Sequence, residues 1–205
     1  MDLAVPVPTI AAAIDARVLS SMKDERVAAS KRISGPTPAK QSSADRKQLI
    51  ADVQDALYAS KICAYAQGMS LIQAGSKEYN WNVNMREMAR IWKAGCIIRA
   101  KFLDSIMQAY ERKQDLPNLL LDDGFGKAVE KAQGGWRRTV VMAQNSGTPV
   151  PAFSASLAYF DSYRSADLPQ NLTQAQRDYF GSHTYQRSDK GKDAPFIHTD
   201  WAHMK

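Results

Sequence analysis

The chain has 205 residues, enough for one domain with a substantial core or for two small ones. Its 44% hydrophobic and 23% charged residues are ordinary for a soluble globular protein. No stretch approaches the roughly 18 apolar residues of a membrane span, and the first ten residues lack the pattern of a signal peptide. We therefore expect no membrane partner.

The formal net charge of +6 could attract an anionic partner, either nucleic acid or a phosphorylated metabolite. The basic residues are spread along the chain, however, without a basic block or a nucleic-acid-binding motif. We therefore expect no nucleic-acid partner, and a basic bundle that binds nucleic acid is the least favoured alternative.

The two cysteines, Cys63 and Cys96, lie in apolar helical patterns, where buried small hydrophobic residues are more common than a disulfide. Two thiols in a chain of this length favour a reducing compartment. We expect a cytoplasmic protein, and an organelle address in a missing N-terminal part stays open.

Apolar residues recur at helical spacing almost throughout, and strict alternation is hard to find, so the sequence predicts an all-α fold. Asn84 is expected to cap a helix, with Glu87 three residues later. The segment 91–103 is apolar on several sides and predicts burial between helices, which would leave Arg99 in need of a partner. The expected helices are residues 10–34, 43–79, 84–113, 125–144, 151–163 and 174–180, the last capped by Asn171 or Thr173.

Residues 1–185 are expected to form one helical domain and residues 186–205 an extended tail. The tail begins with the polar stretch QRSDKGKDAP and continues with Phe196, Ile197 and Trp201. A polar spacer followed by apolar anchors indicates a tail that reaches a distant surface, such as a second subunit.

The sequence contains no nucleophile-elbow, Walker A or G-x-G-x-x-G motif, so we expect no catalytic residue in this chain. His198 and His203 share the tail with Asp200, but this irregular spacing makes a poor metal cage, and no metal is expected. The best candidates are Arg177 and His183, which lie six residues apart with Gly181 between them. An arginine fork and an imidazole donor held this way can bind a phosphate or a carboxylate.

Structural roles compete with this interpretation. Arg177 alone would more often form a helix-end ion pair with Asp178, and Arg17 a surface pair with Asp15 or Asp24.

Five segments together resemble the C-terminal helical domain of the 6-phosphogluconate dehydrogenase family, in order and spacing, across nearly the whole chain. The resemblance is weakest in the loop 37–45 and after Lys190. The segments are ARVLSSMKDERVAASKRISGP (16–36), ALYASKICAYAQGMSLI (56–72), AGCIIRAKFL (94–103), NLLLDD (118–123) and QAQRDYFGSHTY (174–185).

The resemblance implies an NADP-dependent oxidative decarboxylase of the pentose phosphate pathway. Such an enzyme converts 6-phosphogluconate to ribulose 5-phosphate and carbon dioxide as a homodimer. The position of Arg17 binds the substrate phosphate in the family. The positions of Arg177 and His183 reach the same substrate from the second subunit.

The departure from the family pattern is large. The nucleotide-binding domain with its glycine-rich loop, the general-base lysine, the general-acid glutamate and the KGTGKW signature are missing from this sequence. The NADP site is therefore expected mainly in the missing part, and the chain alone is expected to be inactive. A catalytically silent helical dimerisation module is the alternative interpretation.

Overall fold

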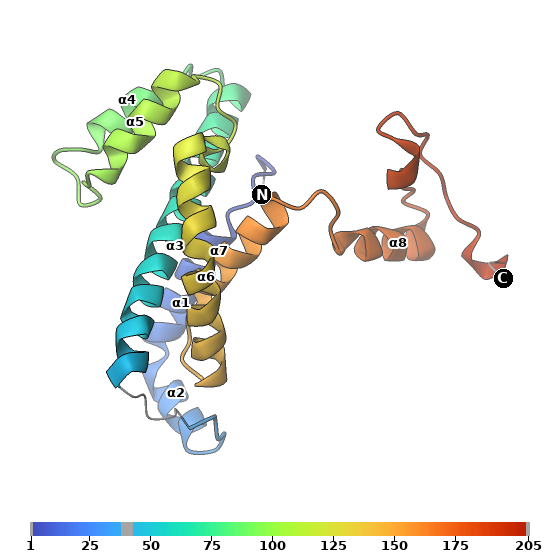
Figure 1. The fold of residues 1–205 in the computed structure, drawn as a ribbon. Coiled ribbons are helices and arrows are strands. Elements are labelled where there is room, and N and C mark those ends of the chain that lie inside the picture. Colours follow the sequence, from blue (N-terminus) through green and yellow to red (C-terminus); the bar gives the residue numbers. More distant parts are fainter. Residues whose placement is uncertain (1, 38–42, 204–205) are drawn as a thin grey trace. The chain divides into compact units, whose positions relative to one another are not determined.

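A computed structural model describes residues 2–37 and 43–203. The described residues form eight α-helices and three short 3-10 helices (Figure 1), so the all-α prediction is confirmed. Their only β-structure is an antiparallel bridge between Tyr185 and Ile197. No described helix has the length and apolar character needed to cross a membrane. The α-helices are α1 (Pro8–Ser21), α2 (Lys23–Ser30), α3 (Ser43–Glu78), α4 (Met85–Ile91), α5 (Phe102–Arg112), α6 (Asp123–Asn145), α7 (Pro151–Tyr163) and α8 (Gln170–Gly181); the 3-10 helices are η1 (Leu119–Leu121), η2 (Ser188–Lys190) and η3 (Trp201–His203).

The chain divides into two compact units, Met1–Phe160 and Asp161–Lys205. The helix α8 and the residues after Tyr185 thus belong to the same compact unit. The functional boundary that we expect between residues 185 and 186 stays a prediction.

The first unit is built around the long helix α3, which packs along α6, while α4 packs against α5 (Figure 1). Trp136 of α6 is fully buried, as are Leu103 and Ile106 of α5. Helix α3 contributes small side chains to the same core, including the fully buried Ala59 and Ala66. Small residues on a long helix let its neighbours approach closely, which explains the central position of α3.

Helix α6 also approaches α3 closely through a glycine. A Cβ atom built on Gly135 would lie 2.6 Å from Oδ2 of Asp55 and 3.1 Å from Cα of Asp52. The adjacent Gly134 has only an ordinary contact, 3.5 Å from Nη1 of Arg138. Gly135 weakens the helix locally but is required by the packing of the two helices.

The single helix expected over residues 10–34 is wrong, because the chain breaks at Met22 between α1 and α2. Met22 leaves the helical region with φ −81° and ψ 50°. The carbonyl oxygens of Leu19 and Ser20 then accept hydrogen bonds of 3.0 Å from Nε and Nη2 of Arg26. A side chain that satisfies these carbonyls makes the break tolerable, and helical periodicity does not reveal it.

The single helix expected over residues 84–113 is also wrong. Asn84 does cap α4, accepting a 3.1 Å hydrogen bond from the amide of Glu87, but α4 ends at Ile91. The chain then turns through Gly95, whose φ of 68° is left-handed. Ile97 is 99% exposed and Arg99 is exposed, so the burial predicted for residues 91–103 is wrong for the loop and for the Arg99 charge and holds only at its end, where Leu103 is fully buried.

In the second unit, α8 begins at Gln170 after Pro169, earlier than either predicted cap. The residues after Tyr185 return toward α8, and Tyr185 and Ile197 exchange two backbone hydrogen bonds of 3.0 Å. Ala194 is only 9% exposed. The polar spacer therefore carries the chain back to its own unit, although Phe196 stays 69% exposed. The expectation that this tail reaches a second subunit stays a prediction.

Candidate phosphate-binding site

Arg177 and His183 line one open pocket of about 380 Å³ at the C-terminal end of α8. The same pocket is lined by Phe180 and Gly181, which lie between them in the sequence, and by one polar face of α8. Both candidate residues are exposed. The structure thus brings together two of the three residues that the sequence analysis selected.

The turn that carries His183 has an unusual backbone. Helix α8 ends at Gly181, and the flanking residues Ser182 and Thr184 have left-handed φ angles of 51° and 58°. A Cβ atom on Gly181 would lie 3.0 Å from Cδ2 of His183, so the imidazole ring packs closely against this glycine. This turn holds the ring at the end of the helix that carries Arg177.

Arg177 does not form the helix-end pair with Asp178 that we considered. Its Nη1 atom donates a 2.9 Å hydrogen bond to Oε1 of Gln174, one turn earlier on α8. Gln174 in turn donates from Nε2 to the carbonyl oxygen of Thr184, at 2.5 Å. Gln174 therefore connects the arginine to the turn of His183.

Asp178 is fully buried, in contrast to the helix-end ion pair with Arg177 that the sequence suggested. Burial by itself raises the pKa of this carboxyl, but four hydrogen bonds outweigh it and hold the pKa well below the usual range. The donors are the amides of Thr199 and Thr184, the His198 ring and the Trp201 indole. An ionised carboxylate that accepts four hydrogen bonds is a strong local tie.

Arg17 lies on α1 in the first unit, where its side chain is exposed. The approach of this residue to Arg177 and His183 therefore stays a prediction.

The remaining histidines have structural partners. His198 bonds Asp178, and His203 contacts Oδ2 of Asp200 through Nδ1 at 2.7 Å. Among the described residues, no group of three or more histidine, cysteine, aspartate or glutamate side chains is arranged to hold a metal ion.

Both cysteines are free thiols. Burial raises the pKa of Cys63 to about 12, so this thiol stays protonated at neutral pH and behaves as a small core residue.

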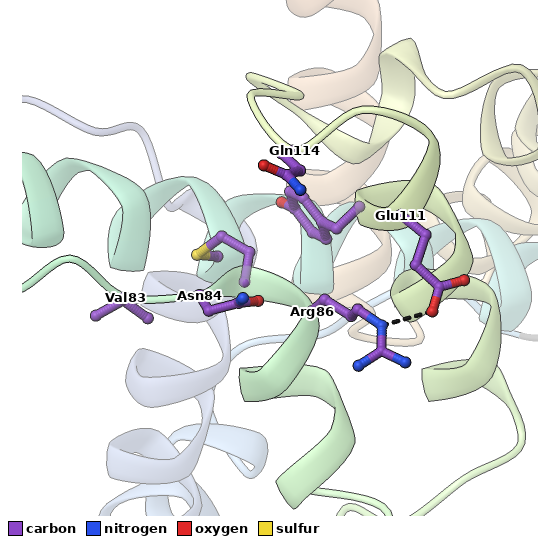
Figure 2. Close-up of a pocket in the computed structure, with 7 residues that line it drawn as sticks. Val83, Asn84, Arg86, Glu111 and Gln114 are labelled. Atoms are coloured by element: carbon purple, nitrogen blue, oxygen red, sulfur yellow. Dashed lines mark hydrogen bonds and ion pairs between the residues drawn. The ribbon is translucent and has the colours of Figure 1, made fainter.

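A second pocket, of about 340 Å³, lies in the first unit where α4 and α5 meet (Figure 2). The labelled side chains include Asn84, Arg86, Glu111 and Gln114. Tyr110 also lines it; this side chain is 2% exposed, and its buried hydroxyl has no hydrogen-bond partner among the described residues. Sequence reasoning missed this pocket because it predicted one continuous helix here.

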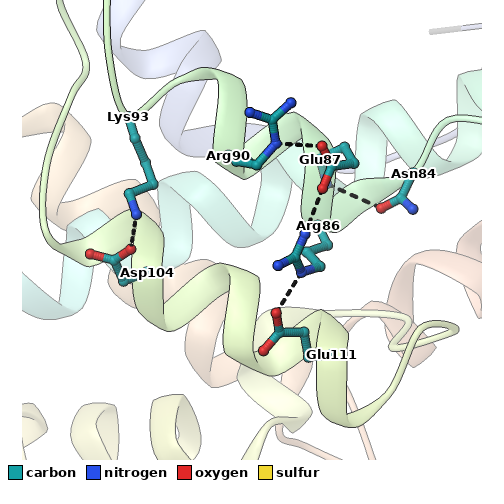
Figure 3. A network of polar contacts seen from close by, with 7 residues as sticks. All are labelled: Asn84, Arg86, Glu87, Arg90, Lys93, Asp104 and Glu111. Carbon is teal, nitrogen blue, oxygen red and sulfur yellow. Dashed lines mark hydrogen bonds and ion pairs between the residues drawn. The ribbon is translucent and has the colours of Figure 1, made fainter.

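A network of charges holds α4 to α5 beside this pocket (Figure 3). Arg86 binds both Glu87, at 2.6 Å, and Glu111, at 2.5 Å. A hydrogen bond from Arg90 is the main reason that the pKa of Glu87 is lowered. Each cation of this network is paired with a carboxylate.

The comparisons with known proteins agree with this architecture. The family model for "6-phosphogluconate dehydrogenase, C-terminal domain" matches residues 1–201. The chain belongs to the 6-phosphogluconate dehydrogenase family. The resemblance seen in the sequence is thereby confirmed, as is the fold that it implied.

Two curated relatives have the name "6-phosphogluconate dehydrogenase, decarboxylating". The protein from Synechocystis sp. is 57% identical over 201 residues, which are 98% of this chain and 41% of the relative. The second relative named so, from Arabidopsis thaliana and with the suffix 2, is 56% identical over 204 residues. The chain thus spans about two fifths of the length of the curated relatives it matches.

A solved structure shows the same fold. The Plasmodium falciparum 6-phosphogluconate dehydrogenase, described in its apo form and in complexes with NADP+ and 6-phosphogluconate, superposes with a TM-score of 0.89 at 44% identity. The match covers 96% of this chain and 42% of that one.

The described residues do not fit NADP by themselves. They contain no strand followed by a glycine-rich loop and a helix, the arrangement that cradles a dinucleotide.

Proposed function

We propose that the chain is the substrate-phosphate-binding and dimerisation part of an NADP-dependent 6-phosphogluconate dehydrogenase. The reaction of the whole enzyme would be the oxidative decarboxylation of 6-phosphogluconate to ribulose 5-phosphate and carbon dioxide in the pentose phosphate pathway. The name of the Bacillus subtilis relative, 51% identical, supports the cofactor: "6-phosphogluconate dehydrogenase, NADP(+)-dependent, decarboxylating".

The single observation that supports the substrate site best is the shared pocket of Arg177 and His183. A guanidinium fork matches two phosphate oxygens, and an imidazole can donate to a third. Acid–base groups are not part of this proposal for the chain; its contribution is to bind the phosphate and fix the sugar acid in position.

We propose a homodimer in which Arg177 and His183 of one copy join Arg17 of its partner at the substrate phosphate. Exposed apolar residues on the first unit support an extended interface, because α1 alone exposes more than half of Ile14, Val18 and Leu19. A cytoplasmic location also stays a proposal, and one relative, from spinach, is named as a chloroplastic enzyme.

The test is a titration of the chain with 6-phosphogluconate, gluconate and inorganic phosphate, followed by NMR signals of Arg177 and His183. We expect 6-phosphogluconate and phosphate to shift both sets of signals and gluconate to leave them unchanged. If gluconate binds as well as 6-phosphogluconate, the assignment of this pocket to the phosphate is wrong.

The catalytically silent dimerisation module remains the second candidate, favoured by the exposed apolar surface. It predicts self-association with no response to 6-phosphogluconate. Analytical ultracentrifugation beside the titration separates the two functions. For the chain alone, we expect no NADPH formation in either case.

A further inference from the structure

The turn that presents His183 is held in a conformation that its own residues disfavour. Ser182 and Thr184, on either side of the histidine, both have left-handed φ angles, which residues other than glycine rarely adopt. Such a backbone persists only where the surroundings hold it in place. The position of the imidazole therefore depends on the groups that fix these two residues.

Both residues are fixed by α8, and chiefly by Asp178. The amide of Ser182 donates to the carbonyl oxygen of Asp178 at 2.8 Å, and the amide of Thr184 donates to its Oδ1 at 2.8 Å. Gln174 holds the carbonyl oxygen of Thr184 from one turn earlier. The turn is thus tied to the helix that carries Arg177.

The same carboxylate also binds the C-terminal segment 198–201. Its Oδ2 accepts from the amide of Thr199 at 3.0 Å and from Nε1 of Trp201 at 2.9 Å, and its Oδ1 contacts Nδ1 of His198 at 3.0 Å. An ionised carboxylate can only accept, so the His198 Nδ1 atom must carry the proton in this bond. One buried side chain therefore joins segments that are about twenty residues apart in the sequence.

We propose that Asp178 is a positioning residue that sets His183 beside Arg177, and that segment 198–201 supports ligand binding through it. Arg177 and Asp178 are neighbours on α8, but the arginine is exposed at the pocket and the aspartate is fully buried. Asp178 and the C-terminal segment thus fix the position of His183 at the pocket without contacting a ligand. This inference rests on the proposed phosphate site.

The test is Asp178→Asn in the full chain, which keeps the size of the side chain but replaces one acceptor oxygen by a donor. That amide meets backbone and indole N–H groups, so at least one hydrogen bond is lost. We expect the NMR signals of the Thr184 amide and the His183 ring to broaden or shift. Affinity for 6-phosphogluconate should fall about tenfold, as expected when the imidazole contact is lost. The helical circular dichroism should be retained.

A milder variant covers the case in which Asp178→Asn does not fold. Trp201→Phe removes one hydrogen-bond donor to the Asp178 carboxylate. It leaves unchanged every residue that lines the pocket of Arg177 and His183. It should weaken binding in the same direction and disturb the same Thr184 signal. The matched control is Asp189→Asn, which removes an exposed carboxylate of the same unit that is paired to Arg187.

The outcomes separate this inference from the proposed function. If the unmodified chain binds neither 6-phosphogluconate nor phosphate, the proposed site is wrong, whatever the variants do. If the unmodified chain binds and both variants bind equally well, with unchanged signals at His183 and Thr184, the positioning role of Asp178 is overturned. An affinity of Asp189→Asn for 6-phosphogluconate as low as that of Asp178→Asn would also overturn it.

Discussion

Arg138 of α6 donates two hydrogen bonds to Asp52 of α3, from Nε at 2.8 Å and from Nη2 at 2.7 Å. The Asp52 side chain is only 6% exposed, and Nε2 of Gln48 donates to it as well, at 2.8 Å. The hydrogen bonds from Arg138 are the main reason that the pKa of this carboxyl lies below its ordinary value of 3.8. The pair links the two longest helices of the first unit.

This lowered pKa predicts how stability depends on pH. A carboxyl whose folded pKa is lowered stabilises the folded state fully above its unfolded pKa and loses that contribution as pH falls through the folded pKa. The urea midpoint should therefore decrease below about pH 4. Asp52→Asn should lower the midpoint at pH 7 and make it less sensitive to acid. The same substitution at the exposed Asp115 is the control, and an equal effect there would contradict the prediction.

Gly135→Ala should destabilise the first unit by about 1–3 kcal/mol, because the new methyl group overlaps Asp55 and the backbone of Asp52. The neighbouring Gly134→Ala is the matched control. Its methyl group meets only the end of Arg138 at 3.5 Å, and alanine favours a helix interior by up to about 1 kcal/mol. Chemical denaturation of both variants measures the difference. Equal stability of the two would show that the helices separate easily at this point.

Tyr110→Phe should leave stability unchanged or increase it, by up to about 1–3 kcal/mol, because it removes a buried hydroxyl that has no partner among the described residues. Tyr159→Phe is the control on a similarly buried tyrosine, whose hydroxyl accepts a 2.8 Å hydrogen bond from Nδ2 of Asn118. That variant should lose about 1 kcal/mol. In chemical denaturation, Tyr110→Phe should be at least as stable as the unmodified chain and Tyr159→Phe less stable. A marked loss for Tyr110→Phe would show that its hydroxyl has a hydrogen-bond partner in solution.

Arg177→Ala should weaken binding of 6-phosphogluconate by about 1.5–3 kcal/mol while the fold stays intact, since it removes one charge-assisted contact. Arg187→Ala is the control. Arg187 is an exposed arginine of the same unit, is paired to Asp189 and lines a different pocket. This control variant changes the net charge equally and should leave affinity nearly unchanged. Titrations of both variants at two salt concentrations distinguish a local contact from general attraction. An unchanged affinity for Arg177→Ala would count against the proposed site.

Periodicity predicted the fold well where one helix buries one continuous face. The prediction over residues 43–79 agrees with α3, and the Asn84 cap was found because its hydrogen bond spans only three residues. Periodicity failed at Met22 and between Ile91 and Phe102. There the breaks depend on carbonyl acceptors and on a left-handed glycine, which leave the apolar spacing unchanged.

The candidate site divides in the same way. Arg177 and His183 could be selected from the sequence because they lie within one short segment, and their role stays a prediction. The role of Asp178 was missed, since its hydrogen bonds to residues 198–201 span about twenty residues and have no local pattern. The role of Gln174 was missed because its hydrogen bond to Thr184 depends on the turn after α8. The role of Asp178 becomes visible only in the structure, which shows the N–H groups that donate to its buried carboxylate.

The loop between α4 and α5 has a consequence for the chain in solution. Ile97 is 99% exposed and Ile98 is 41% exposed, in a segment that the sequence would place in a core. Exposed aliphatic residues of this kind bind hydrophobic dyes and favour aggregation at high protein concentration. Ile97→Ser should therefore improve the colloidal behaviour of the purified chain, measurable by light scattering, with no change in its melting curve.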